Sequence, residues 1–412
     1  MIWVGRLGAN SLAAVGLSGQ IVMVVNYFIM GFFTSLRAMV GRRIGQKDES
    51  GANHVFQQSF IIAIAFSITI AVIGILLSEK ILSLFDADEA VVAIAVPYNR
   101  IQFISTITIA LRMLTEATMQ SSGDTMSAMK IGVLFRVIHI VFCPFLVFGW
   151  SIFPELGVAG AAISNVFSQG LGGVLGLWYL LSGRSRLKVT FRGFRLDFQN
   201  IWRQIKIGVP ASINQLLRNF LGLIILKLVV PFGTLALAAY SLVQRIDTFL
   251  DVGATSLGNA AGILTAQNLG AGNPQRAEKA GWLGVTLATT LMTIISIGIL
   301  IWTEELVRVF NTDPGVVQIG STMLRIGVIG FIMMGSAGVL TNCLNQAGDT
   351  MIPLIVSLVT MWGIQLPLSA YLPGALDINV YGIQWAMVIA LAIRGVVYMV
   401  YFRLGRWKRR KL

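Results

Sequence analysis

Long apolar stretches, separated by short polar breaks, account for most of the chain. A membrane-spanning helix needs about 20 mostly apolar residues, and eleven stretches of that kind follow one another along the sequence. They extend approximately over residues 12–40, 55–77, 91–118, 129–150, 158–181, 207–230, 235–267, 280–302, 316–343, 352–372 and 380–402. The breaks are too short to hold a separate soluble domain. The pattern therefore predicts an all-α integral membrane protein with about eleven transmembrane helices.

The composition agrees with this prediction and excludes several classes of protein. Charged side chains make up 12% of the 412 residues, whereas about a quarter is usual in soluble globular domains. Cys143 and Cys343 lie too far apart, in apolar stretches, to suggest a disulfide framework or a zinc site. His54 and His139 are likewise too separated for a zinc or haem site. We therefore expect no metal, no cofactor and no catalytic residues, and a protein that is not an enzyme.

Basic residues gather in particular loops, and this sets the expected topology. Residues 183–206 hold seven Lys and Arg against one acidic residue, and residues 403–412 hold six with no acidic residue. The loops at 79–89 and 303–315 are richer in acids and fall on the opposite side when the spans are counted alternately. Since basic loops are retained in the cytoplasm, we expect a multi-pass plasma-membrane protein whose basic linker and C-terminus are cytoplasmic. This one-sided placement favours topology over nucleic-acid binding, so no nucleic-acid partner is expected.

The two halves of the chain are related by an internal repeat. A shift of 225 residues superposes them without a gap over more than a hundred positions, and the Gly-Asp-Thr-Met turn at Gly123–Met126 recurs at Gly348–Met351. The shift keeps loops on the same side of the membrane, which predicts parallel repeats related by an axis along the membrane normal. The predicted parts are an N-terminal helical lobe at 1–182, the basic cytoplasmic linker at 183–206, a C-terminal helical lobe at 207–402 and the basic tail at 403–412.

The repeat also predicts unequal lobes, with five helices in the first and six in the second. The helix expected at 207–230 has no counterpart in the first half, because Met1 aligns with Leu226. Either the start codon is misassigned, or the chain is truncated, or the protein has eleven helices. Of these three explanations we favour a start placed too far downstream.

Short motifs are spread over the whole sequence. They are Val4–Gly8, Leu12–Gly16, Arg43–Gly45, Gly157–Ala162, Gly208–Pro210, Gln267–Gly272, Leu366–Leu368 and Gly405–Lys408. Each is weak alone, but together they specifically resemble the multidrug and toxic compound extrusion (MATE) family, from the end of its first helix onward. The resemblance implies two six-helix lobes that form a V-shaped cavity. It also implies export of drug-like, often cationic or amphipathic molecules in exchange for Na⁺ or H⁺.

Polar side chains within the apolar stretches are candidate site residues, because they are costly in lipid and usually line a cavity or pair with one another. Asp247 and Asp251 are four residues apart and so share one helical face. An acidic pair can bind a cation or hold a proton; alternatively, Arg218 or Arg245 neutralises one Asp as a structural ion pair. The substrate-cavity candidates are Asn26, Asn165, Gln169, Asn214, Gln215, Arg218, Asn219, Gln244 and Arg245.

The first lobe departs from the pattern that the resemblance implies. Many relatives carry a coupling Asp on the first family helix, which this sequence does not include. In the fifth family helix the implied cation ligands, Asn and Asp before Pro, are replaced by His139 and Cys143, and a thiol is a poor Na⁺ ligand. His139 is either a titrating group in proton coupling or a packed, hydrogen-bonded core residue. Arg112 and Glu116, also four apart, predict a local ion pair.

Together these features favour a secondary active multidrug exporter that works by alternating access. Its coupling ion is H⁺ or Na⁺, its partners are a drug-like cationic or amphipathic substrate and the lipid bilayer, and we expect a monomer. One alternative is a lipid-linked saccharide or polysaccharide flippase of the same superfamily. Arg218 and Arg245 are compatible with this alternative, because the phosphate of such a substrate needs basic partners. Another is an inactive, N-terminally truncated transporter. A membrane-embedded enzyme is disfavoured, because no catalytic set of residues emerges.

Overall fold

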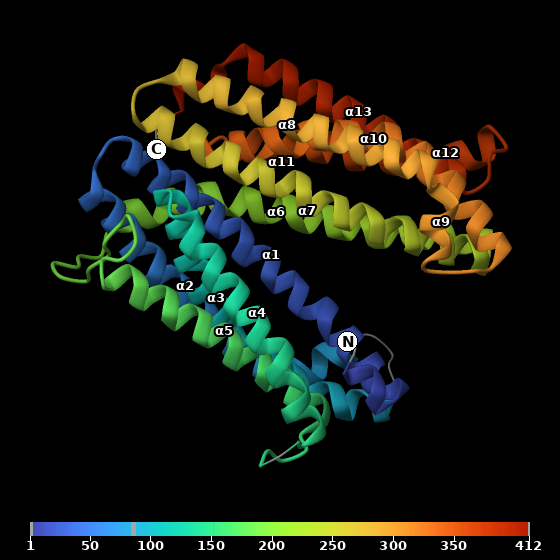
Figure 1. The fold of residues 1–412 in the computed structure, drawn as a ribbon, viewed down its shortest axis with the longest axis horizontal. Helices are drawn as coiled ribbons and strands as arrows, with labels where there is room; N and C mark the ends of the chain where they lie inside the picture. The colour runs from blue at the N-terminus through green and yellow to red at the C-terminus, as the bar shows by residue number, and fades with distance from the viewer. Residues whose placement is uncertain (1–2, 84–87, 151, 411–412) are drawn as a thin grey trace. The chain divides into compact units, whose positions relative to one another are not determined.

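A computed structural model describes residues 3–83, 88–150 and 152–410, and within them every regular element is a helix. Figure 1 shows the helices as long, nearly straight rods. Ten helical segments of the described chain are long and apolar enough to cross a bilayer. A further helix at Thr234–Gly270 has 37 residues but carries Arg245, Asp247 and Asp251 in its interior. The prediction of an all-α, multi-pass membrane protein with about eleven transmembrane helices is confirmed.

The chain divides into two compact units, and the first contains five long helices. These are α1 (Ala9–Gly45), α2 (Glu49–Ser83), α3 (Glu89–Ser122), α4 (Thr125–Phe148) and α5 (Gly157–Leu181). α3 packs along both α2 and α5, and α4 packs along α5. α3 is therefore the central helix of this unit, and its polar side chains are held between neighbouring helices.

The second unit begins within α6 and continues to the end of the described chain. Its helices are α6 (Phe198–Val229), α7 (Thr234–Gly270), α8 (Pro274–Ile301), the short α9 (Thr303–Arg308), α10 (Pro314–Gln346), α11 (Met351–Ser357), the π-helix η3 (Leu358–Gln365), α12 (Leu366–Ala375) and α13 (Tyr381–Leu404). α10 is the central helix, because it packs against α7, α8 and α13. Large apolar side chains, among them Tyr240, Met323 and Phe331, fill the core between the helices.

The internal repeat is visible in the helices themselves. α1 and α7 have 37 residues each and start at Ala9 and Thr234, 225 positions apart. Each follows a short 3₁₀ helix that ends at a glycine with positive φ, Gly8 at 108° and Gly233 at 92°, where a side chain would strain the backbone. The halves differ in that the counterpart of α2 is interrupted at Trp302, between α8 and α9, and the counterpart of α4 contains the π-helix. The helix pattern of the internal repeat is thus confirmed.

The start of α6 differs from the prediction. Asp197 caps this helix, because its Oδ1 accepts a hydrogen bond from Asn200 N at 3.0 Å, and His54 Nε2 of α2 lies 3.1 Å from its other oxygen. These two contacts, with the backbone hydrogen bond as the larger cause, hold the pKa of Asp197 below its ordinary value. A capping residue rather than the onset of apolarity therefore sets the boundary. α6 begins at Phe198, and the basic linker predicted at 183–206 ends inside a helix.

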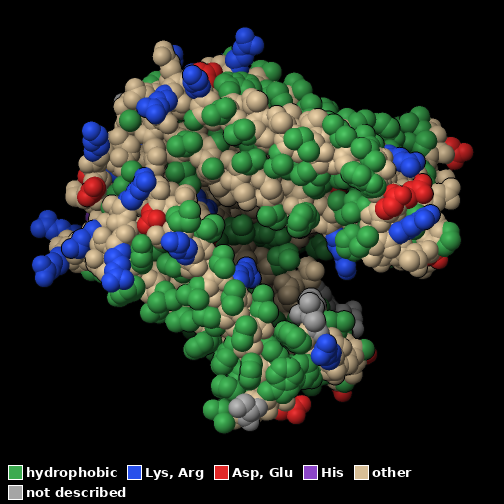
Figure 2. Space-filling model, viewed as in Figure 1, with side chains coloured by type: hydrophobic (Ala, Val, Ile, Leu, Met, Phe, Trp, Pro, Cys, Tyr) green, Lys and Arg blue, Asp and Glu red, His purple; other side chains and the backbone are tan. Residues whose placement is uncertain are grey.

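Apolar side chains cover the sides of the helices. Figure 2 shows hydrophobic side chains over these flanks, with Lys, Arg, Asp and Glu mainly toward the helix ends. Leu76 of α2 is 74% exposed and Phe249 of α7 is 81% exposed. Soluble monomers rarely expose continuous apolar surface of this kind. A lipid surround accounts for it, because helices satisfy their backbone hydrogen bonds internally and can present apolar side chains to lipid.

Candidate functional site

A buried carboxylate on α7 is the most unusual group among the predicted site residues. Asp247 is 6% exposed, and both of its carboxylate oxygens are buried without a hydrogen-bond partner in the described chain. One turn earlier, Gln244 Nε2 donates to the hydroxyl oxygen of Tyr240 at 2.8 Å. An unpaired carboxylate in an apolar span is stable only when a proton or a cation neutralises it. Asp247 therefore has the environment of a group that binds a proton or a cation.

The second acidic candidate has a different environment. The Asp251 side chain is 36% exposed, and its Oδ1 lies 3.5 Å from Nη2 of Arg218 on α6. Arg245 is exposed on α7. The sequence leaves open whether Asp247 and Asp251 act as an acidic pair or whether an Arg neutralises one of them. In the structure Arg218 pairs with Asp251, and Asp247 stays unpaired. The two carboxylates share a helix but not a partner.

A third charged residue of this unit is not among the predicted ones. Arg394 on α13 is 8% exposed, and its Nε donates to Thr360 Oγ1 at 3.1 Å. Thr360 belongs to the π-helix η3, and π-helical turns frequently occur at functional sites. The charge of Arg394 also acts on Asp251 and Arg218. The internal repeat could have identified Arg394 from the sequence, because Arg394 lies 225 positions after the candidate Gln169.

The polar candidates of α6 differ in burial. Asn214 is 6% exposed, and its Oδ1 has no hydrogen-bond partner among the residues that the structure describes. Gln215 and Asn219 are half-buried, and Arg218 is exposed. Because a buried acceptor without a donor is costly, Asn214 is the member of this set whose environment calls for a ligand or a water molecule.

In the first unit, polar side chains of α3 and α5 form a continuous chain of hydrogen bonds. In order, Gln102 Nε2 donates to Tyr98 Oη (2.8 Å), Asn165 Nδ2 to Gln102 Oε1 (3.2 Å), Gln169 Nε2 to Asn165 Oδ1 (3.5 Å) and Arg112 Nε to Gln169 Oε1 (2.5 Å). The structure thus brings together the candidates Asn165 and Gln169 and adds Gln102 and Arg112 from the neighbouring helix. Because each member is satisfied by the next, the chain fixes α3 against α5 and orients Arg112.

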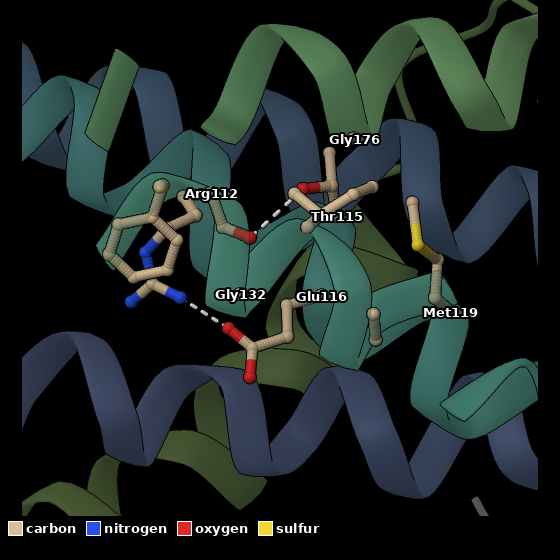
Figure 3. A pocket seen from close by; sticks show the side chains of 9 residues that line it. Arg112, Thr115, Glu116, Met119, Gly132 and Gly176 are labelled. Atoms are coloured by element: carbon tan, nitrogen blue, oxygen red, sulfur yellow. Dashed lines mark hydrogen bonds and ion pairs between the residues drawn. The ribbon is translucent and has the colours of Figure 1, made fainter. Parts of the chain in front are cut away.

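Arg112 also pairs with Glu116, so the ion pair predicted from their spacing is confirmed. Figure 3 shows the guanidinium directed toward the carboxylate along α3. Gln120 donates to the other oxygen of Glu116 at 3.1 Å. On α5, a Cβ at Gly176 would lie 2.4 Å from Thr115 Oγ1, and Figure 3 shows these two residues facing each other. A glycine on α5 therefore lets α3 approach closely enough to form this site.

The remaining first-unit candidates have less distinctive environments. His139 on α4 is half-buried, and its Nδ1 lies 3.4 Å from Ser164 Oγ. A hydroxyl contact fits the packed, hydrogen-bonded interpretation of His139 better than the titrating one. Asn26 is half-buried on α1, at the repeat position that Asp251 occupies in the second half.

The polar sites lie on a chain whose sequence matches the MatE family over residues 1–145 and 210–371. The chain belongs to this family. The MatE match covers most of the sequence and includes helices of both units. It confirms the resemblance that the short motifs indicate.

Relatives of this MatE-family chain include bacterial proteins named for multidrug resistance and for FAD transport. It is 24% identical to the probable multidrug resistance protein YoeA of Bacillus subtilis (strain 168), over 100% of this chain and 90% of the relative. It is 25% identical to an FAD transporter of Shewanella oneidensis, over 96% of this chain and 87% of the relative. The similarity therefore extends along nearly the whole length in each case.

Solved structures share the fold of this MatE-family chain. A crystal structure of MATE in the bent conformation superposes with a TM-score of 0.92 at 20% identity, covering 98% of this chain and 89% of the other. A MOP superfamily transporter from Pyrococcus furiosus also superposes with a TM-score of 0.92 at 20% identity, covering 100% of this chain and 91% of the other. The fold is thus that of MATE transporters.

Proposed function

We propose that this MatE-family protein is a secondary active exporter of drug-like cationic or amphipathic molecules, driven by exchange for H⁺ or Na⁺. The name of the relative YoeA supports export of drugs, and that of the FAD transporter supports a wider range of small-molecule substrates. The proposal includes a plasma-membrane location with a cytoplasmic linker and tail, because basic loops are retained there. We also propose that the protein is a monomer.

The burial of Asp247 without a partner is the observation that carries the coupling step. When the carboxyl group of Asp247 is ionised, it places an uncompensated charge inside an apolar span. When the group is protonated, it carries no charge. The free-energy difference is on the order of several kcal/mol. A difference of that size is sufficient for proton binding to select between two conformations of the protein.

Of the two coupling ions, the site favours H⁺. A single carboxyl group is sufficient to carry a proton, whereas a hard cation such as Na⁺ prefers several oxygen ligands. Asp251 is paired with Arg218, so its carboxylate is already engaged. Asp247 is left as the carboxyl group that takes up the proton.

Ethidium efflux tests the coupling role. Cells expressing the native chain are compared with Asp247→Asn, Asp251→Asn and a matched control, Asp377→Asn, which changes an exposed loop residue. We expect Asp247→Asn to abolish efflux driven by a pH gradient, because an amide does not take up or release a proton in the physiological pH range. Asp251→Asn should reduce efflux by leaving Arg218 unpaired, and the control should match the native protein.

Membrane vesicles separate the two ions, because a pH gradient and a Na⁺ gradient are imposed one at a time. Native efflux should follow the pH gradient. Efflux that follows the Na⁺ gradient alone would contradict proton coupling. Undiminished efflux in Asp247→Asn would contradict the role of this residue.

A second candidate function is the movement of an anionic, lipid-linked saccharide. It is favoured by basic residues inside the spans, Arg112, Arg218 and Arg394, since guanidinium groups bind phosphate through paired hydrogen bonds. The efflux assay distinguishes the two functions. A well-folded native protein that exports no ethidium would favour the lipid-linked substrate.

A further inference from the structure

The basic segment that follows α13 is anchored in the second unit. It contains the 3₁₀ helix η4 (Arg406–Arg409), which is separated from α13 by Gly405. The φ of Gly405 is 70°, in the left-handed region, and this lets the chain turn at the helix end. Trp407 is fully buried, stacks on Phe402 at 4.5 Å between ring centroids, and donates from its indole nitrogen to the Phe402 carbonyl oxygen at 2.8 Å. The segment is therefore a fixed part of the fold.

Two ion pairs hold this segment and engage the carboxylates around it. Lys408 Nζ lies 2.6 Å from Glu278 Oε2 of α8, and Arg410 Nη2 lies 3.1 Å from Asp349 Oδ1 in the turn between α10 and α11. The stretches of sequence around these contacts contain no other acidic residue; they are 263–285, 340–357 and 398–410. Both local carboxylates are therefore already neutralised by the segment itself.

Three arginines of the same segment have no acidic partner in the described chain. Arg403, Arg406 and Arg409, which we call the tail patch, are all exposed. Arg406 and Arg409 are three residues apart in a 3₁₀ helix, so they project from one face. Trp407, between them, is buried in the unit. The tail patch is therefore an outward-facing set of guanidinium groups on a rigid support.

The tail patch lies at the depth of lipid headgroups. α13 has 24 residues, which at 1.5 Å per residue extend over about 36 Å, slightly more than a ~30 Å hydrocarbon core. Arg403 is the residue before the last one of α13, and the last one, Leu404, is 62% exposed. Arg406 and Arg409 follow directly. Since lipid phosphates lie just outside the core, they are within reach of all three arginines.

We propose that the tail patch binds the phosphate group of an anionic phospholipid in the leaflet that faces the basic tail. A guanidinium group binds phosphate oxygens through paired hydrogen bonds, and a cluster of Lys and Arg directly after a membrane helix attracts anionic headgroups. The lipid supplies the negative charge that Glu278 and Asp349, already paired, do not. This interaction goes beyond the proposed transport function and does not depend on it, because it involves neither Asp247 nor a transported substrate.

Binding is measured by native mass spectrometry of the purified full chain in detergent, titrated with phosphatidylglycerol or with zwitterionic phosphatidylcholine. The native protein should prefer phosphatidylglycerol. We expect the triple variant Arg403→Gln/Arg406→Gln/Arg409→Gln to bind this lipid about a hundredfold more weakly, since each basic residue near the surface contributes a factor of about five. The triple Arg→Lys variant keeps the charge but loses the paired hydrogen bonds, so its affinity should be intermediate.

The matched control is the triple variant Lys188→Gln/Arg192→Gln/Arg195→Gln. It removes the same charge from exposed positions of the basic linker, and it should keep the native affinity for phosphatidylglycerol. The tail-patch side chains are exposed, so their substitution should leave the melting temperature in lipid-free detergent unchanged. That measurement checks that a loss of binding is not a loss of folding.

Equal affinity of the native protein for the two lipids would overturn the proposal, and so would an unchanged affinity in the triple Gln variant of the tail patch. An equal loss in the linker control would show that net charge, rather than the tail patch, attracts the lipid, and would also overturn it. Displacement of phosphatidylglycerol by inorganic phosphate would assign the tail patch to free phosphate instead of a lipid. The titration needs no ion gradient, so its result is independent of coupling through Asp247.

Discussion

Arg394 and Asp247 are both buried charged residues of the second unit, and they differ in what surrounds the charge. Arg394 donates to Thr360 at 3.1 Å, whereas neither oxygen of Asp247 has a partner in the described chain. A buried charge with a hydrogen-bond partner holds neighbouring elements in place. One without a partner is stable only in its neutral or ligand-bound form. The first arrangement predicts a structural role and the second a change of protonation during transport.

Replacing Thr360 by Val tests the structural role of the Arg394 contact. Val has a similar shape but no acceptor for Arg394 Nε, so a buried charge loses a hydrogen bond, at a cost of about 2 kcal/mol. We expect Thr360→Val to lower the melting temperature in detergent. Thr360→Ser keeps the hydroxyl group and should melt close to the native protein. If the Val variant melted with the native protein, the contact would contribute nothing to stability.

At the scale of helices, the packing of α3 against α5 and their polar contacts depend on each other. A Cβ at Gly176 would lie 2.4 Å from Thr115 Oγ1, and Thr115 is buried. The same two helices are joined by the contacts of Gln169 with Arg112 and of Asn165 with Gln102. Separating α5 from α3 would therefore break the hydrogen bonds that orient Arg112.

Gly176→Ala tests this dependence. The added methyl group overpacks the α3–α5 contact, and we expect a loss of about 1–3 kcal/mol in stability. Gly132→Ala on α4 is the control, because a Cβ at that position has open space around it. Alanine favours the helix relative to glycine, so the control should melt at or above the native temperature. Thermal melting in detergent compares them, and identical curves for the two variants would show that close approach at Gly176 is unimportant.

The start of α6 shows where prediction from hydropathy alone reaches its limit. Helix number and the repeat follow from the lengths of apolar runs and from one register of 225 residues, and both can be recognised along the chain. The start of α6 instead depends on Asp197, a single capping residue inside a basic segment. Spacing along one helix also identifies Arg112 with Glu116. It does not identify Arg394 with Thr360, because those partners lie on different elements.

Taken as a whole molecule, the two repeats have the same helix pattern but different polar chemistry. Gln169 of the first half corresponds to Arg394 of the second, and Asn26 corresponds to Asp251. A neutral amide in the first unit thus stands where a charged residue stands in the second. The unpaired carboxylate lies in the second unit, on α7, whereas the chain of hydrogen bonds from Tyr98 to Arg112 lies in the first. The repeat therefore supplies two equivalent helical scaffolds that carry different polar side chains.

Membrane orientation is the property of the whole molecule that the loop charges predict. The linker at 183–206 carries seven basic residues, so it should remain in the cytoplasm. A tobacco etch virus protease site inserted at Gly193, which has open space around it, reports on this linker. The matched control is the same site inserted at the exposed Asp377, in the loop between α12 and α13.

The two insertions should be cut from opposite sides of the membrane, because α13 separates the control loop from the basic tail. In inside-out vesicles we expect the protease to cut at Gly193 and not at Asp377. In right-side-out spheroplasts the pattern should be reversed, and detergent should expose both sites. Cleavage at Gly193 in intact spheroplasts would place the basic linker outside. The protein would then have the opposite orientation in the membrane, and the proposed direction of substrate movement, from the face that carries the linker to the other face, would be reversed as well.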